Sequence, residues 1–279
     1  MTVLMENIAF GEGPRWHNGH LWFSDMHGQQ VIKLAPNGSH EIILRLQDDQ
    51  PSGLGWLPDG DLLIVSMQKR QVLRFDGKNL SVHADLSPMA SCHCNDMVVD
   101  ALGRSYVGNF GFDLHNGAEA EPGELIRVDI DGSIHLMDNN LNFPNGAVIT
   151  PDGNTLIIAE TFAGTLTAYD IDAEGDLSNR REWARLEGGA LPDGMCLDAE
   201  NGGWVASPTT NECVRVLEGS KITHRIKIDR SAFACMIGGN RLFVCSSKES
   251  DPFACARAQD ARIEVFPVPF TAAGYPLSE

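Results

Sequence analysis

Four oxygen-bearing side chains stand at matching points of a pattern that repeats along this sequence. They are Glu12, Asn95, Asn145 and Asp193, and three of the four are followed directly by glycine. Carboxylates and side-chain carbonyls are the donors that hard divalent cations such as Ca²⁺ prefer in proteins. If the fold brings these four side chains together, they would form an oxygen-lined cation site.

Each of these residues also has a simpler explanation as a turn residue. Asn and Asp before Gly are common in tight turns, because Gly tolerates positive φ and the short polar side chains hydrogen-bond to nearby backbone. The shared position of the four residues in a repeat favours the cation site over four unrelated turns. Whether the four residues form one site therefore depends on the secondary-structure elements that carry them.

The repeated pattern is a β-hairpin. In the stretch FPNGAVITPDGNTLIIAET, residues 143–161, two apolar runs flank a Pro-Asp-Gly turn, which predicts two antiparallel strands. Five further hairpins of this kind follow one another at intervals of 40 to 50 residues. The six copies begin at Glu12, Ser52, Asn95, Asn145, Asp193 and Ala234.

Further strand-like segments lie between the hairpins, for example residues 71–75 and 165–169. Four strands per period of this length are typical of a propeller blade. We therefore predict an all-β fold, a single domain over residues 1–279 that forms a six-bladed β-propeller of four-stranded antiparallel blades. The last repeat is one strand short, so we expect Thr2–Ile8 to pair beside Arg262–Val268 and close the ring.

A propeller would explain why polar residues open the hairpins. The first strand of each blade lines the central channel, so the opening residues of six blades form a ring around the axis. Glu12 and Asp193 are both carboxylates, and no Lys or Arg stands at the same position to neutralise them. Burying two like charges is costly unless they are paired or bound to a metal. The sequence therefore predicts a divalent cation, with Ca²⁺ favoured, among the side-chain oxygens of Glu12, Asn95, Asn145 and Asp193.

Charge and composition argue against several classes of partner. The formal net charge is −17, and such a surface repels nucleic acid and anionic membranes. No apolar run approaches the 18 residues of a membrane-spanning helix. The first ten residues do not resemble a signal peptide, and the odd number of cysteines, seven, suits reduced thiols, so we expect a cytoplasmic protein. Nothing in the sequence indicates an obligate protein partner.

Two other kinds of chemistry find little support in the sequence. The fragment Cys92-His93-Cys94 has the residue types of a zinc site, but no second Cys/His pair stands at zinc spacing. No Gly-x-Ser-x-Gly elbow occurs, so a serine-hydrolase mechanism is not indicated.

The motifs around the four oxygen-bearing residues resemble those of a known family. They are Gly11–Trp16, Asn95-Asp96, Pro144-Asn145-Gly146 and Pro192–Met195, in the family's order and spread over nearly the whole chain. By these motifs the sequence is similar to the SMP-30/gluconolactonase/regucalcin family, which also contains lactonases like diisopropylfluorophosphatase. The resemblance implies a six-bladed propeller with a divalent metal in its channel, often Ca²⁺ and sometimes Zn²⁺, Mn²⁺ or Mg²⁺.

The resemblance also implies roles for individual residues. Glu12, Asn145 and Asp193 match the family's direct metal ligands, and Asn95 matches a ligand or a near-metal substrate contact. Asp193 further matches the catalytic residue. Sugar-lactonase relatives often have Arg two residues before the first Asn, where this chain has His93. A smaller or less hydroxylated lactone therefore fits at least as well as a sugar lactone.

The resulting expectation is a metal-dependent carboxylic ester hydrolase that opens a small-molecule lactone. The metal would polarise the carbonyl, and Asp193 would act as general base toward water or as nucleophile. The sequence does not separate these two roles. An organophosphate or other ester hydrolase, a calcium-binding propeller without turnover, and a scaffold that binds peptides are the alternatives.

Hairpin geometry suggests which residues contact the substrate. The second strand of each hairpin ends at the face where the first began, which places Asn109 near the channel mouth. We expect Asn95, His93, Asn109, Phe110 and Asp113 to contact the substrate. Each of these residues also has an ordinary structural explanation.

Overall fold

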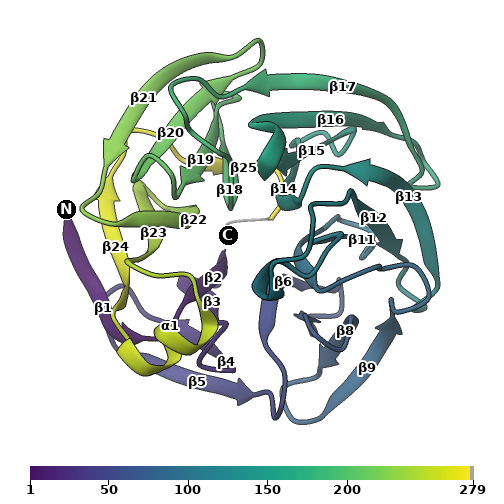
Figure 1. Cartoon of the computed structure of the whole chain (residues 1–279), viewed down its shortest axis with the longest axis horizontal. Helices are drawn as coiled ribbons and strands as arrows, with labels where there is room; N and C mark the ends of the chain where they lie inside the picture. The colour runs from purple at the N-terminus through teal and green to yellow at the C-terminus, as the bar shows by residue number, and fades with distance from the viewer. Residues whose placement is uncertain (277–279) are drawn as a thin grey trace.

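Six antiparallel sheets surround one axis in the computed structural model, which describes residues 1–276 (Figure 1). The expected six-bladed propeller is confirmed. The expectation of a single domain over residues 1–279 stays a prediction, since it includes residues 277–279, which lie outside the described part. From inner to outer, the strands of the first blade are β2 (Gly11–His17), β3 (His20–Asp25), β4 (Gln30–Leu34) and β5 (His40–Arg45). Those of the second blade are β6 (Pro51–Trp56), β7 (Leu62–Ser66), β8 (Gln71–Phe75) and β9 (Leu80–Asp85). Those of the third blade are β10 (Cys94–Val99), β11 (Ser105–Asn109), β12 (Gly123–Val128) and β13 (Ile134–Leu141).

The other three blades follow the same order around the ring. The fourth blade has β14 (Pro144–Ile149), β15 (Thr155–Glu160), β16 (Thr165–Ile171) and β17 (Leu177–Arg185). The fifth blade has β18 (Met195–Asp198), β19 (Gly203–Ser207), β20 (Glu212–Leu217) and β21 (Lys221–Lys227). The sixth blade has β22 (Ser231–Gly238), β23 (Arg241–Ser247), β24 (Ala261–Pro267) and β1 (Thr2–Ile8). Three short helices lie in the connections, namely η1 (Leu114–Asn116), η2 (Thr161–Ala163) and α1 (Pro252–Ala258).

Burial explains why the inner strands read as continuous apolar runs. Every residue of β14 is buried, and β15 is buried after its first residue, because neighbouring blades cover both faces. The outer strand β5 has no buried residue and carries charged side chains. The turn between β14 and β15 places Gly153 at a φ of 75°, a conformation that glycine adopts without steric cost.

The ring is closed by the N-terminal strand. β1 pairs antiparallel with β24 through Thr2 opposite Val265 and Ile8 opposite Ala261. In Figure 1 the purple β1 lies beside the yellow β24, although they come from opposite ends of the chain. The predicted closure is therefore confirmed, and the last blade obtains its fourth strand.

A C-terminal segment crosses the far end of the channel, which the sequence analysis did not foresee. The short strand β25 (Ala272–Ala273) pairs with the inner strand β18 through Leu197 opposite Ala273. Beyond it, the backbone of Tyr275 exchanges two hydrogen bonds with Ile149 of β14, at 2.8 and 3.0 Å. Both contacts lie at the ends of β18 and β14 away from Asp193 and Asn145.

One buried arginine ties the inner strands of three blades together. Arg15 on β2 donates from Nε to the carbonyl of Leu54 on β6, at 2.8 Å. Its Nη2 donates to the Asp96 carboxylate and to the Met97 carbonyl on β10, both at 2.6 Å. Arg15 and Asp96 are 2% and 5% exposed, so the guanidinium depends on these partners to offset its desolvation.

No helix within residues 1–276 is long and apolar enough to cross a membrane. The seven cysteines are all free, and six of them are buried.

Deleting residues 1–8 is expected to open the ring and destabilise the whole fold. The deletion removes the β1–β24 ladder and exposes the core around the buried Ile8. We expect the melting temperature to fall by about 10 °C or more, as measured by circular dichroism. Glu6→Ala, which removes only the exposed ion pair with Arg262, should change it by no more than about 2 °C. Equal melting temperatures for the deletion and the intact chain would contradict the closure.

Replacing Arg15 should destabilise the protein far more than replacing a surface arginine. Arg15→Met leaves the Asp96 carboxylate buried without its cation, which typically costs about 3–5 kcal/mol. The matched control is Arg74→Met, because Arg74 pairs with Asp59 and Asp61 at a partly exposed site and should cost less than about 1 kcal/mol. Urea unfolding of both variants measures the loss in free energy of unfolding. Similar losses would show that the buried ion pair stabilises the fold no more than the surface pair does.

Candidate functional site

The candidate site begins at bulges in the inner strands. Pairing of β2 with β3 shifts register between Glu12 and Arg15. Pairing of β14 with β15 shifts between Pro144 and Ala147, so Asn145 lies inside the bulge. A bulge inserts one unpaired residue and turns a side chain away from the regular alternation of the strand. The bulges therefore aim the opening residues of the blades.

Strand pairing also fixes which residues are equivalent in the six blades. Gly11 lies opposite Asp25, and in the last blade Ser231 lies opposite Ser247 at the same point of the hairpin. The residue equivalent to Glu12 is therefore Ala232, whereas the sequence analysis started this repeat at Ala234. The error arose because the apolar run of β22 gave no mark of its bulge, and it leaves the ring chemistry unchanged since both residues are alanine.

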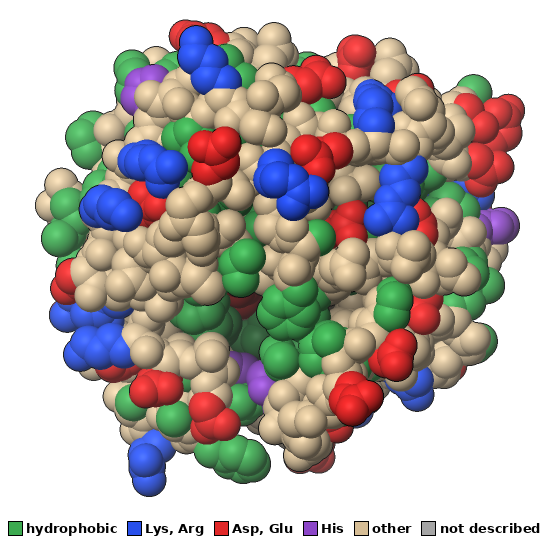
Figure 2. Space-filling model, turned by 45° about the horizontal axis from the view of Figure 1, so that its top comes forward, with side chains coloured by type: hydrophobic (Ala, Val, Ile, Leu, Met, Phe, Trp, Pro, Cys, Tyr) green, Lys and Arg blue, Asp and Glu red, His purple; other side chains and the backbone are tan. Residues whose placement is uncertain are grey.

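The four oxygen-bearing side chains come together in one cavity. Glu12, Asn95, Asn145 and Asp193 all line a cavity of about 100 Å³. Their exposed fractions are 8%, 5%, 6% and 7%. Figure 2 shows a hollow in this face of the ring, with hydrophobic and histidine side chains in it. No Lys or Arg is among the described residues that line the cavity.

Hydrogen bonds to neighbouring segments orient the two asparagines. The Nδ2 of Asn145 donates to Oγ1 of Thr161, at 3.3 Å, and this hydroxyl donates to the Pro192 carbonyl at 2.8 Å. The Nδ2 of Asn95 donates to the Pro144 carbonyl at 3.3 Å. Both amide nitrogens therefore face protein acceptors. The side-chain oxygens of the two asparagines are therefore the atoms that could bind a cation.

The two carboxylates of the site stand in an unfavourable electrostatic environment. Burial raises the pKa of Glu12 well above its ordinary value, and the negative charges of Asp193 and Asp96 raise it further. Burial also raises the pKa of Asp193 to about 8, and the charge of Asp96 adds to the effect, while hydrogen bonds from Asn145 and the Gly194 N–H oppose it. Arg15 offsets only part of this repulsion, because its guanidinium binds Asp96 directly.

The donor set fits a hard divalent cation. Two carboxylates and two amide side chains bring oxygen ligands of the kind that Ca²⁺ prefers to one cavity, and a cation would neutralise the repulsion between Glu12 and Asp193. Within residues 1–276 no group of three or more His, Cys, Asp or Glu side chains is arranged to hold a metal. A metal in this cavity would therefore need the amide oxygens of Asn145 and Asn95 as well as the carboxylates.

The structure separates the predicted substrate contacts into two groups. Asn95 and Phe110 line the cavity, whereas Asn109, His93 and Asp113 are not among its described lining residues. The His93 ring lies beside two residues of the wall, with its centroid 6.1 Å from that of Phe110 and 6.4 Å from that of His115. Asp113 caps η1, where its Oδ1 accepts a hydrogen bond from the Asn116 N–H at 3.2 Å.

Asn109 has a structural function at the end of its strand. Its Nδ2 donates to the Glu124 carboxylate at 2.7 Å, and its Oδ1 accepts from the Gly111 N–H at 2.9 Å. Equivalent residues in other blades hold the loop that leads into the inner strand. Asp25 accepts from the Phe10 N–H at 2.9 Å, and Glu160 accepts from the Asn142 N–H at 2.8 Å. This position of the repeat thus serves to anchor loops.

Most of the cavity wall was missed by the sequence analysis. The residues that it missed are Phe10, Met26, His27, Leu114, Phe143, Phe233 and Ser250. His115, which the sequence suggested beside Asp113 as a contact for substrate hydroxyls, also lines the cavity. Phe10 and Phe143 each stand directly before an inner strand, so an alignment of the repeats could have found them. Leu114, His115 and Ser250 come from connections of irregular length, for which the repeat gives no signal.

His27 is a neutral member of this wall. Burial lowers its pKa to about 4, and the nearby His115 lowers it further, while the Ser250 backbone and Asp251 oppose the shift. Its Nδ1 lies 3.0 Å from the Nε2 of Gln50. At neutral pH the imidazole therefore adds hydrogen-bonding capacity to the cavity without adding charge.

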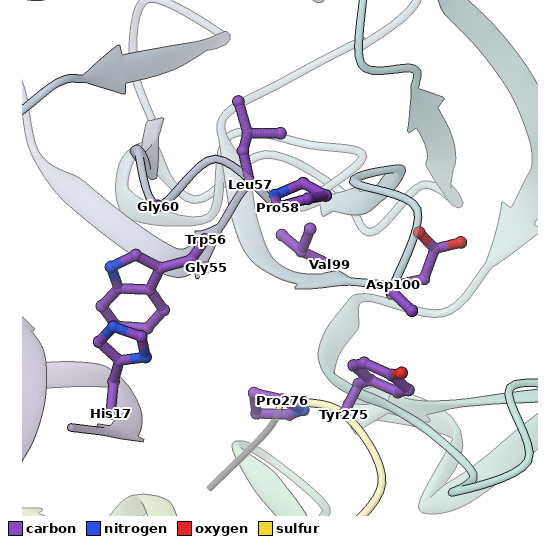
Figure 3. Close-up of a pocket in the computed structure, with 11 residues that line it drawn as sticks. His17, Gly55, Trp56, Leu57, Pro58, Gly60, Val99, Asp100, Tyr275 and Pro276 are labelled. Carbon is purple, nitrogen blue, oxygen red and sulfur yellow. The ribbon is translucent and has the colours of Figure 1, made fainter. Parts of the chain in front are cut away.

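A second and larger cavity, of about 260 Å³, lies at the opposite end of the channel (Figure 3). The rings of His17 and Trp56 stack there with centroids 4.0 Å apart, and Tyr275 of the C-terminal segment forms another side. Asp100, the only carboxylate among its described lining residues, is paired with Arg104 at 2.6 Å. Because no set of polar groups converges in this cavity, the smaller cavity is the candidate site.

The chain is similar in sequence to known proteins. Residues 10–248 match the family model described as the SMP-30/gluconolactonase/LRE-like region. Regucalcin from Oryctolagus cuniculus is 25% identical over 273 residues, covering 93% of this chain and 90% of the relative. The pentonolactonase XacC from Haloferax volcanii is 29% identical over 210 residues, covering 73% of this chain and 68% of the relative.

Solved structures show that the fold is shared. A luciferin-regenerating enzyme superposes with a TM-score of 0.80 at 20% identity, covering 99% of this chain and 97% of the other. A gluconolactonase from Xanthomonas campestris superposes with a TM-score of 0.77 at 23% identity, covering 96% and 88%. With the family model matching most of its length, the chain belongs to the SMP-30/gluconolactonase/LRE-like family.

Proposed function

We propose that this protein is a metal-dependent lactonase, a carboxylic ester hydrolase that opens a small cyclic ester. The observation that carries the proposal is the gathering of four buried oxygen-bearing side chains in one cavity without a Lys or Arg among its described lining. The family match and the relative named pentonolactonase support lactone hydrolysis in particular.

The cation of this site is proposed to be Ca²⁺, with Zn²⁺, Mn²⁺ or Mg²⁺ as other divalent candidates. Glu12, Asn145 and Asp193 would hold it, with Asn95 beside them as a further ligand or a substrate contact. A solved structure of similar fold from Agrobacterium tumefaciens is named a calcium-binding protein, regucalcin. When bound, such a cation supplies Lewis-acid polarisation of the ester carbonyl.

Asp193 is the residue proposed to move the proton. In one route, a water oxygen attacks the lactone carbonyl carbon while the Asp193 carboxylate accepts the water proton. The bond between the carbonyl carbon and the ring oxygen then breaks, and the ring oxygen takes the proton, so the product is an open hydroxy acid. In the other route, the Asp193 carboxylate attacks the carbonyl carbon, the bond to the ring oxygen breaks, and this oxygen takes a proton from water. Water then hydrolyses the acyl–enzyme anhydride, which releases the hydroxy acid and restores the Asp193 carboxylate.

Asn95 and Phe110 are the proposed substrate contacts of the inner cavity. The Asn95 amide can hydrogen-bond to the ester, and the Phe110 ring can pack against the lactone ring. His93 and Asp113 lie beside this wall, so we place them at most in contact with a larger substrate. Asn109 is bound to Glu124 and Gly111, and we assign it no part in substrate binding.

A calcium-binding propeller without turnover is the second candidate, which the relatives named regucalcin favour. Hydrolysis of an organophosphate or another ester would use the same cavity. Turnover on a panel of lactones separates the first candidate from the second. We also propose that the protein works in the cytoplasm on a free small molecule, which its seven free cysteines and acidic composition support.

Removing one amide ligand should weaken metal binding without abolishing it. Asn145→Ala takes one oxygen from the proposed set, so we expect the Kd for Ca²⁺ to rise about 10-fold or more, measured by isothermal titration calorimetry on chelator-treated protein. Excess Ca²⁺ should restore part of the lactonase activity. The matched control is Ser52→Ala, which changes the equivalent position of another blade, where the buried hydroxyl has no hydrogen-bond partner among the described residues. Unchanged Ca²⁺ affinity in Asn145→Ala would exclude this ligand.

Replacing the proposed base should stop turnover while the fold is kept. Asp193→Asn retains a side-chain oxygen but removes the proton acceptor, so kcat should fall by roughly 10²–10⁴-fold. A pH-indicator assay follows the acid released by lactone opening, and a melting curve confirms that the variant is folded. Full activity of the folded variant would exclude Asp193 as base and as nucleophile.

A further inference from the structure

We infer that the substrate is a lactone with an apolar substituent, rather than a polyhydroxylated sugar lactone. The inference rests on the proposed lactonase function and names the substrate class of the same cavity. It comes from the chemistry of the wall above the four oxygen-bearing residues.

The wall of the cavity is dominated by apolar side chains. They are Phe10, Met26, Phe110, Leu114, Phe143 and Phe233. Above the four oxygen-bearing residues, the described polar side chains of the lining are His27, His115 and Ser250. A sugar lactone buries several hydroxyl groups, and each needs a hydrogen-bond partner to offset its lost hydration. This wall offers few partners for several hydroxyls but ample contact for hydrocarbon.

A row of aromatic rings leads from the cavity to the surface. Phe110 and Phe143, which both line the cavity, stack with ring centroids 4.5 Å apart. Phe143 in turn lies 4.8 Å from Phe162 on η2, whose side chain is 48% exposed. On the other side of the cavity, Phe10 packs 4.6 Å from Phe233. A substituent on the lactone ring can therefore follow hydrocarbon from the cavity to solvent along the row Phe110, Phe143 and Phe162.

The connections around the cavity also expose large apolar side chains. Leu114 on η1 is 39% exposed, and Phe253 on α1 is 88% exposed. α1 begins two residues after Ser250, which lines the cavity, and in Figure 1 it lies at the lower left of the ring, in the region of β1 and β4. Single exposed apolar residues are ordinary. Phe162 and Phe253 are the two exposed phenylalanines of the described residues. Phe162 packs against Phe143 of the cavity wall, and Phe253 follows Ser250 of the wall by three residues.

The dimensions divide the substrate into two parts. The cavity of about 100 Å³ suits one small ring, whose ester group would face the four oxygen-bearing residues. The aromatic row then takes an alkyl or aryl substituent of that ring. Each buried methylene is worth about 0.8 kcal/mol, which corresponds to about a fourfold gain in kcat/KM.

The test is a lactone panel assayed with Ca²⁺-loaded protein and a pH indicator. The panel contains γ-lactones with no side chain and with side chains of two, four and six carbons, dihydrocoumarin as an aryl lactone, and a pentono-1,4-lactone. We expect kcat/KM to rise by up to about fourfold per methylene over the first few carbons. For the six-carbon lactone, kcat/KM should exceed the value for the pentonolactone by at least about 10-fold.

Phe162→Ser tests the aromatic row without changing the four oxygen-bearing residues. Because Phe162 is partly exposed, we expect the variant to fold. We expect the variant to keep the kcat/KM of the unsubstituted lactone and to lose at least about threefold on the six-carbon lactone. The matched control is Leu136→Ser, at a similarly exposed position on the outer strand β13, which should change neither value.

The outcomes separate this inference from the proposed function. Turnover that favours the pentonolactone, or that is indifferent to chain length, overturns the inference and leaves the lactonase in place. An unchanged chain-length preference in Phe162→Ser overturns the aromatic row as the path of the substituent. Absence of turnover on every lactone overturns the proposed function, and the inference with it.

Discussion

Strand β1 reaches the last blade from the other end of the chain, and its pairing with β24 holds six blades around one axis. In an open arc the inner strands of the first and last blades would not face each other, and two sheet edges would be left unpaired. Closure brings Glu12 from the first blade to the same cavity as Asp193 from the fifth. The geometry of the site therefore depends on the pairing of two strands, β1 and β24, from opposite ends of the chain.

The closed ring creates an electrostatic conflict that the chain resolves only in part. Glu12, Asp96 and Asp193 approach one another in a region from which water is largely removed. Arg15 neutralises Asp96 and at the same time ties three inner strands together. No described cation of the protein lines the cavity beside Glu12 and Asp193. The fold thus holds these two carboxylates close together without a Lys or Arg beside them, and the proposed metal site rests on this arrangement.

Polar and apolar chemistry are separated along the depth of the cavity. The inner strands and the residues just before them supply the oxygen-bearing floor, and a bulge at the same point of five of the six hairpins turns one side chain out of the regular alternation. The connections supply the apolar wall through residues such as Leu114 and Phe143. A family that shares the floor can therefore change its substrates by changing the connections, which are free to vary in length.

The repeat of apolar runs and turns determined the fold from the sequence, because four strands per period can bury their faces only against neighbouring blades. The same repeat placed Glu12, Asn95, Asn145 and Asp193 at one level of the channel, since equivalent positions of a ring must face its axis. The sequence could not place Ala232 correctly, because no residue type marked the bulge of β22. It suggested Asn109 as a substrate contact, whereas the tertiary structure uses this side chain to hold a loop. The part of the wall formed by Leu114 and Ser250 was decided by the tertiary structure alone. The physical reason is that these residues come from connections without a repeat, whose paths depend on packing against blades far away in the chain.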